Sequence, residues 1–268
     1  MIGRKRLPQN HQDWNKRWNA PFGDAPTGLS VTQRLADPDR ERFGPFAFQW
    51  NSMTRILEYP WAYHAAELEP GMRVLEVGGG LSGLQYVLDM EGCEVTNVDP
   101  SATDDDETWR AMPFPGYAWT LTPANHALLN KTFGTGVRLV AERLQDADLP
   151  AGGFDRVLCL SVLEHLDPDE GRSLLERIGE LLAPEGRCVL TIDLFLDLRP
   201  FGVLERNVWG TNVDVSHLVE GFELVEGDRR ELHGFPEFDL DHVVGRLPEL
   251  FVGNYPALSQ TLVLRKAR

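Results

Sequence analysis

Long apolar runs are absent from this chain of 268 residues. None approaches the roughly 20 consecutive apolar residues that a membrane-spanning helix needs. The first ten residues carry the basic charges of a signal peptide, but no apolar segment follows them. We therefore expect no association with a membrane.

Cysteine is also scarce, with three residues that lie far apart in the sequence. Cys159 and Cys188 fall in apolar, strand-like segments, where a free cysteine behaves as a small buried hydrophobe. No CxxC spacing suggests zinc binding or redox chemistry. The cysteines predict a reducing, cytoplasmic location and no metal site of their own.

Basic residues are fewer than acidic ones. The chain has 26 lysines and arginines and 41 acidic residues, which gives a formal net charge of −15. Such a surface repels nucleic-acid backbones and anionic lipids. The apolar fraction of 42% and the charged fraction of 25% are typical of a soluble globular protein. The length suits one large α/β domain with additions, and a small molecule is the expected partner.

Apolar strands alternate with helical segments from residue 72 onwards. Apolar residues at helical spacing predict helices over 81–90 and 168–184. The predicted strands cover 72–77, 93–99, 137–142, 154–163, 186–193, 222–232 and 259–267. Apolar strands separated by helices indicate a mainly parallel sheet covered on both faces.

The first 67 residues form a separate region that is rich in tryptophan. Residues 1–45 have many prolines, glycines and arginines and little periodicity, which predicts an extended arm with one short helix. Residues 48–68 are expected to be helical in part, with an interruption near Pro60. Trp14, Trp18, Trp50 and Trp61 either pack back onto the body or form a lid over a pocket.

The stretch VLEVGGGLSG at 74–83 joins an apolar strand to a glycine-rich turn. Gly78, Gly80 and Gly83 fit the dinucleotide fingerprint G-x-G-x-x-G, and Asp99 follows Gly78 by 21 residues. An acid at that point accepts hydrogen bonds from the two hydroxyls of a ribose. The pattern predicts a nucleoside-containing cofactor but does not separate NAD from S-adenosylmethionine.

Glu76 separates the two cofactors, because it precedes the glycines by two residues. A carboxylate there attracts the ammonium group of S-adenosylmethionine and repels the pyrophosphate of NAD. This charge favours S-adenosylmethionine.

Four segments in order resemble the class I S-adenosylmethionine-dependent methyltransferases, particularly the small-molecule group that includes the ubiquinone and menaquinone C-methyltransferases. They are PGMRVLEVGGG (70–80), VTNVDPS (95–101), LQDADLPAGGFDRVLCLSVLEHL (144–166) and LLAPEGRCVLTID (181–193). The resemblance implies a Rossmann-like α/β fold, with a seven-stranded, mostly parallel sheet, an antiparallel last strand and helices on both faces. It places the methyltransferase domain at 68–268, with acceptor-site insertions at about 194–217 and 233–257.

The resemblance also implies the cofactor site. Glu76 would bind the methionine amino group and Asp99 the ribose hydroxyls, while either Gln145 or Asp146 would accept from the adenine amino group. The glycine turn would lie along the methionine and ribose. The remaining predicted cofactor residues are Gly78, Gly79, Gly80, Pro100 and Ser161.

His165 and His217 are the candidate catalytic residues, although each also suits a structural role. The candidate acceptor-binding residues are Trp61, Tyr63, Arg199, Trp209 and His233. Their types predict a small, partly aromatic or apolar acceptor, with or without an anionic group. Residues 233–242 hold histidines and acids at spacings that suit a divalent metal, but a solvated acidic loop is the simpler interpretation, so no metal is predicted.

Methyl transfer from S-adenosylmethionine to a small molecule is the predicted function, carried out by a monomer or homodimer. A base is needed only if the acceptor must lose a proton. The sequence leaves two alternatives: an NAD-dependent oxidoreductase that uses the same glycines, and an accessory protein that binds S-adenosylmethionine without transferring its methyl group.

Overall fold

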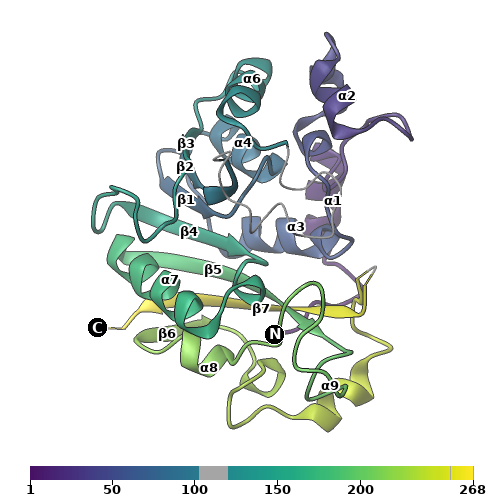
Figure 1. Ribbon diagram of the computed structural model, residues 1–268, viewed down its shortest axis with the longest axis vertical. Coiled ribbons are helices and arrows are strands. Elements are labelled where there is room, and N and C mark those ends of the chain that lie inside the picture. Colours follow the sequence, from purple (N-terminus) through teal and green to yellow (C-terminus); the bar gives the residue numbers. More distant parts are fainter. Residues whose placement is uncertain (103–119, 254, 268) are drawn as a thin grey trace.

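A seven-stranded sheet forms the centre of the computed structural model, which describes residues 1–102, 120–253 and 255–267 (Figure 1). The strand order is β3-β2-β1-β4-β5-β7-β6. The strands are β1 (Arg73–Val77), β2 (Glu94–Val98), β3 (Arg138–Val140), β4 (Phe154–Leu160), β5 (Leu182–Phe195), β6 (Phe222–Glu226) and β7 (Ala257–Lys266).

The first five strands run parallel, and β7 is antiparallel to both β5 and β6. Val77 at the end of β1 pairs with Val98 of β2 and Cys159 of β4, so the carboxyl ends of these strands meet at one edge. The predicted fold class is confirmed. Strand β5 is longer than the predicted 186–193, because its carboxyl end continues to pair with β7 as far as Phe195.

Helices and short 3₁₀ turns connect the strands. The α-helices are α1 (Gln9–Trp18), α2 (Val31–Ala36), α3 (Arg55–Ala65), α4 (Gly83–Met90), α6 (Pro123–Phe133), α7 (Pro168–Leu181), α8 (Val215–Leu218) and α9 (Leu240–Arg246). The 3₁₀ turns are η1 (Arg40–Phe43), η2 (Pro45–Phe48), η3 (Pro100–Ala102), η4 (Leu163–His165) and η5 (Arg229–Glu231). Among the described residues, no helix is both long and apolar enough to cross a bilayer.

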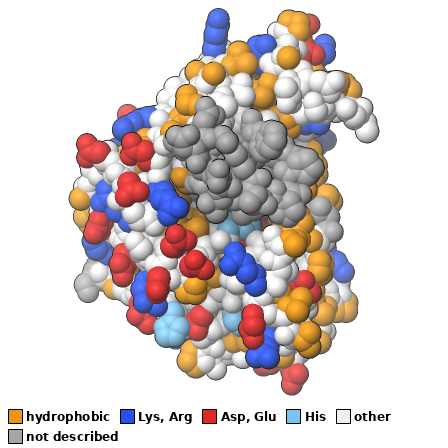
Figure 2. All heavy atoms as spheres, in the orientation of Figure 1, with side chains coloured by type: hydrophobic (Ala, Val, Ile, Leu, Met, Phe, Trp, Pro, Cys, Tyr) orange, Lys and Arg blue, Asp and Glu red, His pale blue; other side chains and the backbone are white. Residues whose placement is uncertain are grey.

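The two faces of the sheet pack into separate cores, because successive side chains of a strand point to opposite faces. Leu75 and Val157 lie in the core that α7 and α8 cover, whereas Val74 and Leu158 lie in the core that contains α4 and α6. Continuous apolar strands are therefore buried on both sides, as a covered parallel sheet requires. On the surface, basic side chains are scattered among acidic ones on the face seen in Figure 2.

The aromatic arm packs onto the body, on the face of the sheet that carries α4. Trp14 and Phe46 of the arm belong to the same core as Leu84 of α4. Gly83 permits this contact, because a Cβ there would lie 2.6 Å from the ring of Phe46. Packing onto the body, one of the two predicted roles of the arm, is thus observed for these side chains.

The predicted interruption of the helix near Pro60 is wrong, because α3 runs through this residue. Proline lacks an N–H, so the carbonyl of Ile56, four residues earlier, loses its helical donor. The side-chain amide of Asn15, in α1, donates to that carbonyl at 2.7 Å. The arm thus supplies the hydrogen bond that the proline removes, which the local sequence could not indicate.

Replacing Asn15 with alanine should therefore destabilise the protein by about 1–2 kcal/mol, because the Ile56 carbonyl loses its donor. The cost should fall to less than half in the Pro60→Ala background, since the substituted alanine provides the missing N–H. Denaturant unfolding of the wild type, both single variants and the double variant measures this coupling. Additive effects of the two substitutions would contradict the assignment.

Candidate cofactor and acceptor site

The turn after β1 requires glycine at three successive positions for different reasons. Gly78 and Gly80 have φ angles of +67° and +59°, which strain any residue that carries a Cβ. Gly79 is limited by space, because a Cβ there would lie 2.6 Å from the carboxyl carbon of Glu76 and 2.9 Å from Asn97 Oδ1. The turn is therefore built closely around the buried Glu76.

Side chains at the end of β2 hold this turn in place. Asn97 is fully buried, and it accepts from the Gly79 N–H and donates to the Gly80 carbonyl. Asp99 accepts from the Gly80 N–H at 2.8 Å. The sequence analysis did not identify Asn97; the signal was an amide side chain at the end of a strand, two residues before the predicted ligand Asp99.

Glu76 is the buried carboxylate of the site, with 3% of its surface exposed. Oε1 accepts from the hydroxyl of Ser82 at 2.9 Å, whereas Oε2 has no hydrogen-bond partner among the described residues. Burial raises the pKa of Glu76 to about 7. It lines a small recess together with Gly78 and Arg55, both of which also line the main cavity. This arrangement suits a cationic group of a ligand.

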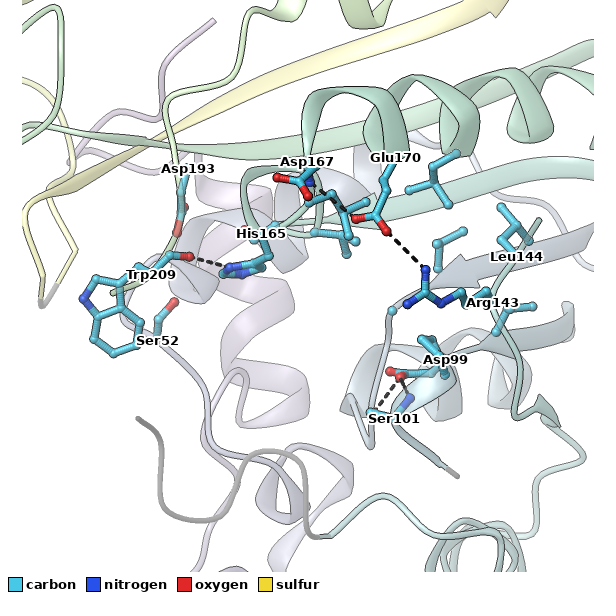
Figure 3. A pocket seen from close by; sticks show the side chains of 18 of the residues that line it. Ser52, Asp99, Ser101, Arg143, Leu144, His165, Asp167, Glu170, Asp193 and Trp209 are labelled. Carbon is cyan, nitrogen blue, oxygen red and sulfur yellow. Dashed lines mark hydrogen bonds and ion pairs between the residues drawn. The ribbon is translucent and has the colours of Figure 1, made fainter. Parts of the chain in front are cut away.

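The main cavity has a volume of about 350 Å³ and lies at the carboxyl edge of the sheet (Figure 3). Asp99, Ser101, Arg143 and Leu144 lie at one end, while Ser52, His165, Asp193 and Trp209 lie at the other. The other lining residues are Trp50, Arg55, Val77, Gly78, Val98, Pro100, Gln145, Ser161, Val162, Leu166, Asp167, Glu170, Leu174 and Tyr255. Of the residues that the structure describes before α3, Trp50 and Ser52 reach it.

The end of the cavity at Asp99 is polar. Asp99 Oδ1 accepts from both the backbone N–H and the hydroxyl of Ser101, at 2.9 and 2.6 Å. Arg143 forms an ion pair with Glu170 at 3.2 Å across this part of the cavity (Figure 3). Of the two residues proposed for the adenine, Gln145 lines the cavity, whereas Asp146 is exposed and outside the lining.

His165 lies at the opposite end, in η4. Its Nδ1 is 2.5 Å from the carbonyl oxygen of Trp209, and since a carbonyl only accepts, Nδ1 must carry the proton and donate. Burial lowers the pKa of His165 to about 4, so the ring is neutral at pH 7. Its Nε2 is then an acceptor, which suits proton abstraction from a bound molecule.

Asp193 and Tyr255 form this end together with Trp209. The Tyr255 hydroxyl donates to Asp193 Oδ2 at 2.7 Å, and the rings of Tyr255 and Trp209 stack with centroids 4.6 Å apart. The sequence analysis named Trp209 but neither Asp193 nor Tyr255. Asp193 could have been found as the acid near the carboxyl end of an apolar strand, the position that Glu76 holds in β1.

A buried ion pair from α3 completes the wall. Arg55 donates to Glu58 at 2.6 Å and contacts the hydroxyl of Ser161 at 3.1 Å. Ser161 has a φ of +50°, which is strained for a residue with a side chain, and its N–H is held by the Thr191 carbonyl. Ser161 was predicted, but Arg55 was missed because nothing in its local sequence marks it.

Two predicted acceptor residues from α3 lie outside the cavity lining. Tyr63 donates to Glu91, and Trp61 donates to Glu226 at 3.4 Å. Arg55 is the residue of α3 that lines the cavity, and Trp61 and Tyr63 lie on other sides of this helix.

Three further predicted residues also lie outside the lining. His217 is 65% exposed and contacts Glu220, while Arg199 pairs with Glu205 on the surface. His233 is 2.9 Å from the Val213 carbonyl through Nδ1 and so ties two connections together. Loop geometry directs these three side chains away from the cavity.

Two acids of 233–242 form ion pairs on the surface, and His242 lies in a group with other acids. Asp239 pairs with Arg230, and Glu237 pairs with Arg229. His242 lies with Asp228 and Glu231 in a group whose ligand atoms are within 4.8 Å of one another. Glu231, however, already accepts from Arg4 and from the Ile2 N–H, so arginine occupies the place of a cation.

Residues 51–226 match the family model described as "Methyltransferase domain". The chain belongs to this methyltransferase family. S-adenosylmethionine is therefore the cofactor, which decides between the two nucleosides that the glycine pattern left open. The match ends at the carboxyl end of β6, and no curated protein matched the chain significantly.

Solved structures share this fold over most of the length of this chain. The [4+2]-cyclase SpnF is 15% identical, with 99% of both chains covered and a TM-score of 0.54. The 1,6-didemethyltoxoflavin-N1-methyltransferase of Burkholderia thailandensis is 17% identical, with 100% of this chain and 95% of that chain covered and a TM-score of 0.51. The N-methyltransferase NodS of Bradyrhizobium japonicum WM9 is 14% identical, with 89% and 97% covered and a TM-score of 0.50.

The residues of the turn fit this cofactor. Oε2 of Glu76, which has no hydrogen-bond partner among the described residues, suits an ammonium group, and the carboxylate of Asp99 lines the cavity, where its chemistry suits hydroxyl groups. Gly78 lines the cavity and has no side chain to hinder close approach of the ligand.

Glu76→Gln tests the role of this buried charge. The pKa of Glu76 is about 7 in the folded protein and has its ordinary value of 4.5 in the unfolded chain. Between these pH values Glu76 ionises only in the unfolded chain, so the free energy of unfolding of the cofactor-free protein falls as pH rises from about 4.5 to 7. At pH 8 the variant should exceed the wild type by about 1–3 kcal/mol in free energy of unfolding, and at pH 4 the two should agree. Denaturant unfolding at both pH values measures this.

The same variant should bind S-adenosylhomocysteine at least about tenfold more weakly, because the ammonium group loses its counter-ion. Calorimetry measures the affinity. Asp148→Asn is the matched control, since it removes one exposed acid outside the cavity. Equal affinity of Glu76→Gln and the control would contradict the assignment.

Proposed function

We propose that this methyltransferase acts on a small-molecule acceptor that binds at the His165 end of the cavity. The supporting observation is that one cavity has both the residues suited to the cofactor, near Asp99, and a second set, near His165 and Asp193, to which the resemblance assigns no contact with the cofactor. The cavity of about 350 Å³ falls within the usual range for small-molecule sites. A single chain lines it, so a monomer or homodimer suffices.

Bound S-adenosylmethionine supplies an electrophilic methyl group, so the chain has mainly to orient an acceptor and exclude water. Glu76 would hold the ammonium group, and Asp99 would accept from the ribose hydroxyls. Gln145, which lines the cavity, would accept from the adenine amino group, and Arg55 would lie near the methionine carboxylate. Pro100 and Ser161 line the space between these groups.

The acceptor would lie against Trp209, and His165 would take its proton through Nε2. The hydrogen bond from Nδ1 to the Trp209 carbonyl fixes the ring in the tautomer that a base requires. The relation to the quinone C-methyltransferases stays a prediction, as do the division at residue 67 and the acceptor-site insertions. Those two insertions provide Trp209 and Tyr255, which stack on each other.

Labelled S-adenosylmethionine incubated with the protein and a cell extract tests the proposal. Label should pass to the small-molecule fraction and not to protein or nucleic acid. His165→Asn should lower kcat by about 10²–10³-fold and change the KM for S-adenosylmethionine little, because the base acts on the acceptor. Transfer of label to macromolecules alone would overturn the proposal.

The pH profile separates the two titrating groups. In the wild type, the KM for S-adenosylmethionine should fall as pH rises through about 7, because Glu76 gains the charge that binds the ammonium group. The contribution of His165 to kcat should be constant above about pH 5 and be lost as pH falls through about 4. A kcat that falls with protonation of a group near pH 7 would count against His165.

A further inference from the structure

Three buried acids surround the acceptor end of the cavity. Glu58 of α3, Glu164 of η4 and Asp193 of β5 are 0%, 0% and 1% exposed. Arg55 is the buried cation that faces Asp193, and it is engaged with Glu58 at 2.6 Å. Among the described residues, therefore, neither Glu164 nor Asp193 forms an ion pair with a buried basic side chain.

Glu164 and Asp193 form a coupled pair. The backbone N–H of Asp193 donates to Glu164 Oε1 at 3.1 Å, which brings the two acids together. Burial raises the pKa of Asp193 to about 7, and burial together with the charge of Asp193 raises the pKa of Glu164 well above its usual range. Each of the two acids therefore holds its proton more tightly than an exposed carboxyl group does, and ionisation of one opposes ionisation of the other.

Asp193 is the member of the pair that lines the cavity. Tyr255 donates to Oδ2, which stabilises the ionised form of Asp193 and leaves the proton on Glu164. Oδ1 of Asp193 has no hydrogen-bond partner among the described residues, although the side chain is almost fully buried. An unpaired buried carboxylate oxygen is costly, so this atom is suited to a donor that a ligand brings.

A flat aromatic surface lies beside that oxygen. The rings of Trp209 and Tyr255 are stacked at an interplanar angle of 16°, and Figure 3 shows Trp209, His165 and Asp193 around the same end of the cavity. Aromatic faces attract planar rings and cations. The charge and the aromatic surface therefore favour the same chemistry in a ligand.

We propose that the acceptor is an aromatic or arylalkyl amine, whose N–H donates to Asp193 Oδ1 while its ring lies against Trp209. The lone pair of the neutral amine would form the bond to the methyl carbon as the bond from that carbon to sulfur breaks, S-adenosylhomocysteine would leave, and the N–H proton would pass to His165 Nε2. This inference depends on the proposed function and specifies its substrate class. The amine replaces the anionic group that the sequence allowed, because Arg199 pairs with Glu205 on the surface, and a carboxylate beside Asp193 Oδ1 would be repelled by it.

Binding of matched probes tests the inference on the full chain saturated with S-adenosylhomocysteine. Phenethylamine and tryptamine are compared with 3-phenylpropionate and indole-3-propionate, which have the same rings and the opposite charge. We expect the amines to bind at least about tenfold more tightly in calorimetry. Their affinity should rise with pH through about 7, as Asp193 ionises. The charged and titratable groups that face it are Glu58, Glu164, Arg55 and Tyr255, and His165 lies at the same end of the cavity (Figure 3).

Asp193→Asn should abolish the preference for amines and lower their affinity at least about tenfold, while S-adenosylhomocysteine binds as before. Unchanged binding of that nucleoside also shows that the variant is folded. Tyr255→Phe should weaken amine binding less, because Oδ1 remains in place. Asp148→Asn, which removes an exposed charge outside the cavity, should leave both affinities unchanged.

Three results would overturn the inference: no amine binds, the carboxylates bind as tightly as the amines, or Asp193→Asn keeps the preference. Loss of S-adenosylhomocysteine binding in Asp193→Asn, with a wild-type circular dichroism spectrum, would assign Asp193 to the cofactor and also overturn it. Label transfer to macromolecules alone would refute the proposed function itself. Label transfer to a small molecule without amine preference would refute the inference alone.

Discussion

A buried carboxylate near the end of β1, which forms no ion pair with the residues that the structure describes, is the constraint on which the site depends. Burying Glu76 costs free energy that one hydrogen bond from Ser82 offsets in part. The turn must close over it, which excludes a side chain at Gly79 and requires Asn97 to hold the backbone. The same strain-bearing turn starts α4, whose first residue, Gly83, allows the arm to pack against it.

The parallel sheet explains why the acids of the site gather. Chain segments far apart in sequence end at one edge, and the buried strands β1 and β5 each carry an acid near that edge, with Asp99 directly after β2. Such charges cannot be neutralised by the apolar layers on either face. They are held by hydrogen bonds at the edge of the cavity, so both ends of the cavity follow one structural rule.

The arm has two separate roles. Its first part fills the core beside α4, and Asn15 replaces the hydrogen bond that Pro60 removes from α3. Its last part, with Ser52 followed by Arg55 in α3, reaches the cavity. A helix stabilised by the arm thus carries the cation that holds Glu58 and contacts Ser161, which links the packing of the arm to the geometry of the site.

The sequence by itself determined the strand pattern, the glycine turn and the acids Glu76 and Asp99, because these depend on local periodicity, backbone strain and charge within one short stretch. It did not determine which side chains of the loops face the cavity. Asp193 and Tyr255 are 62 residues apart and meet through the antiparallel pairing of β5 with β7, and Arg55 reaches Ser161 across 106 residues. Such contacts depend on how distant segments pack, so only the tertiary structure decided which side chains meet at the His165 end of the cavity.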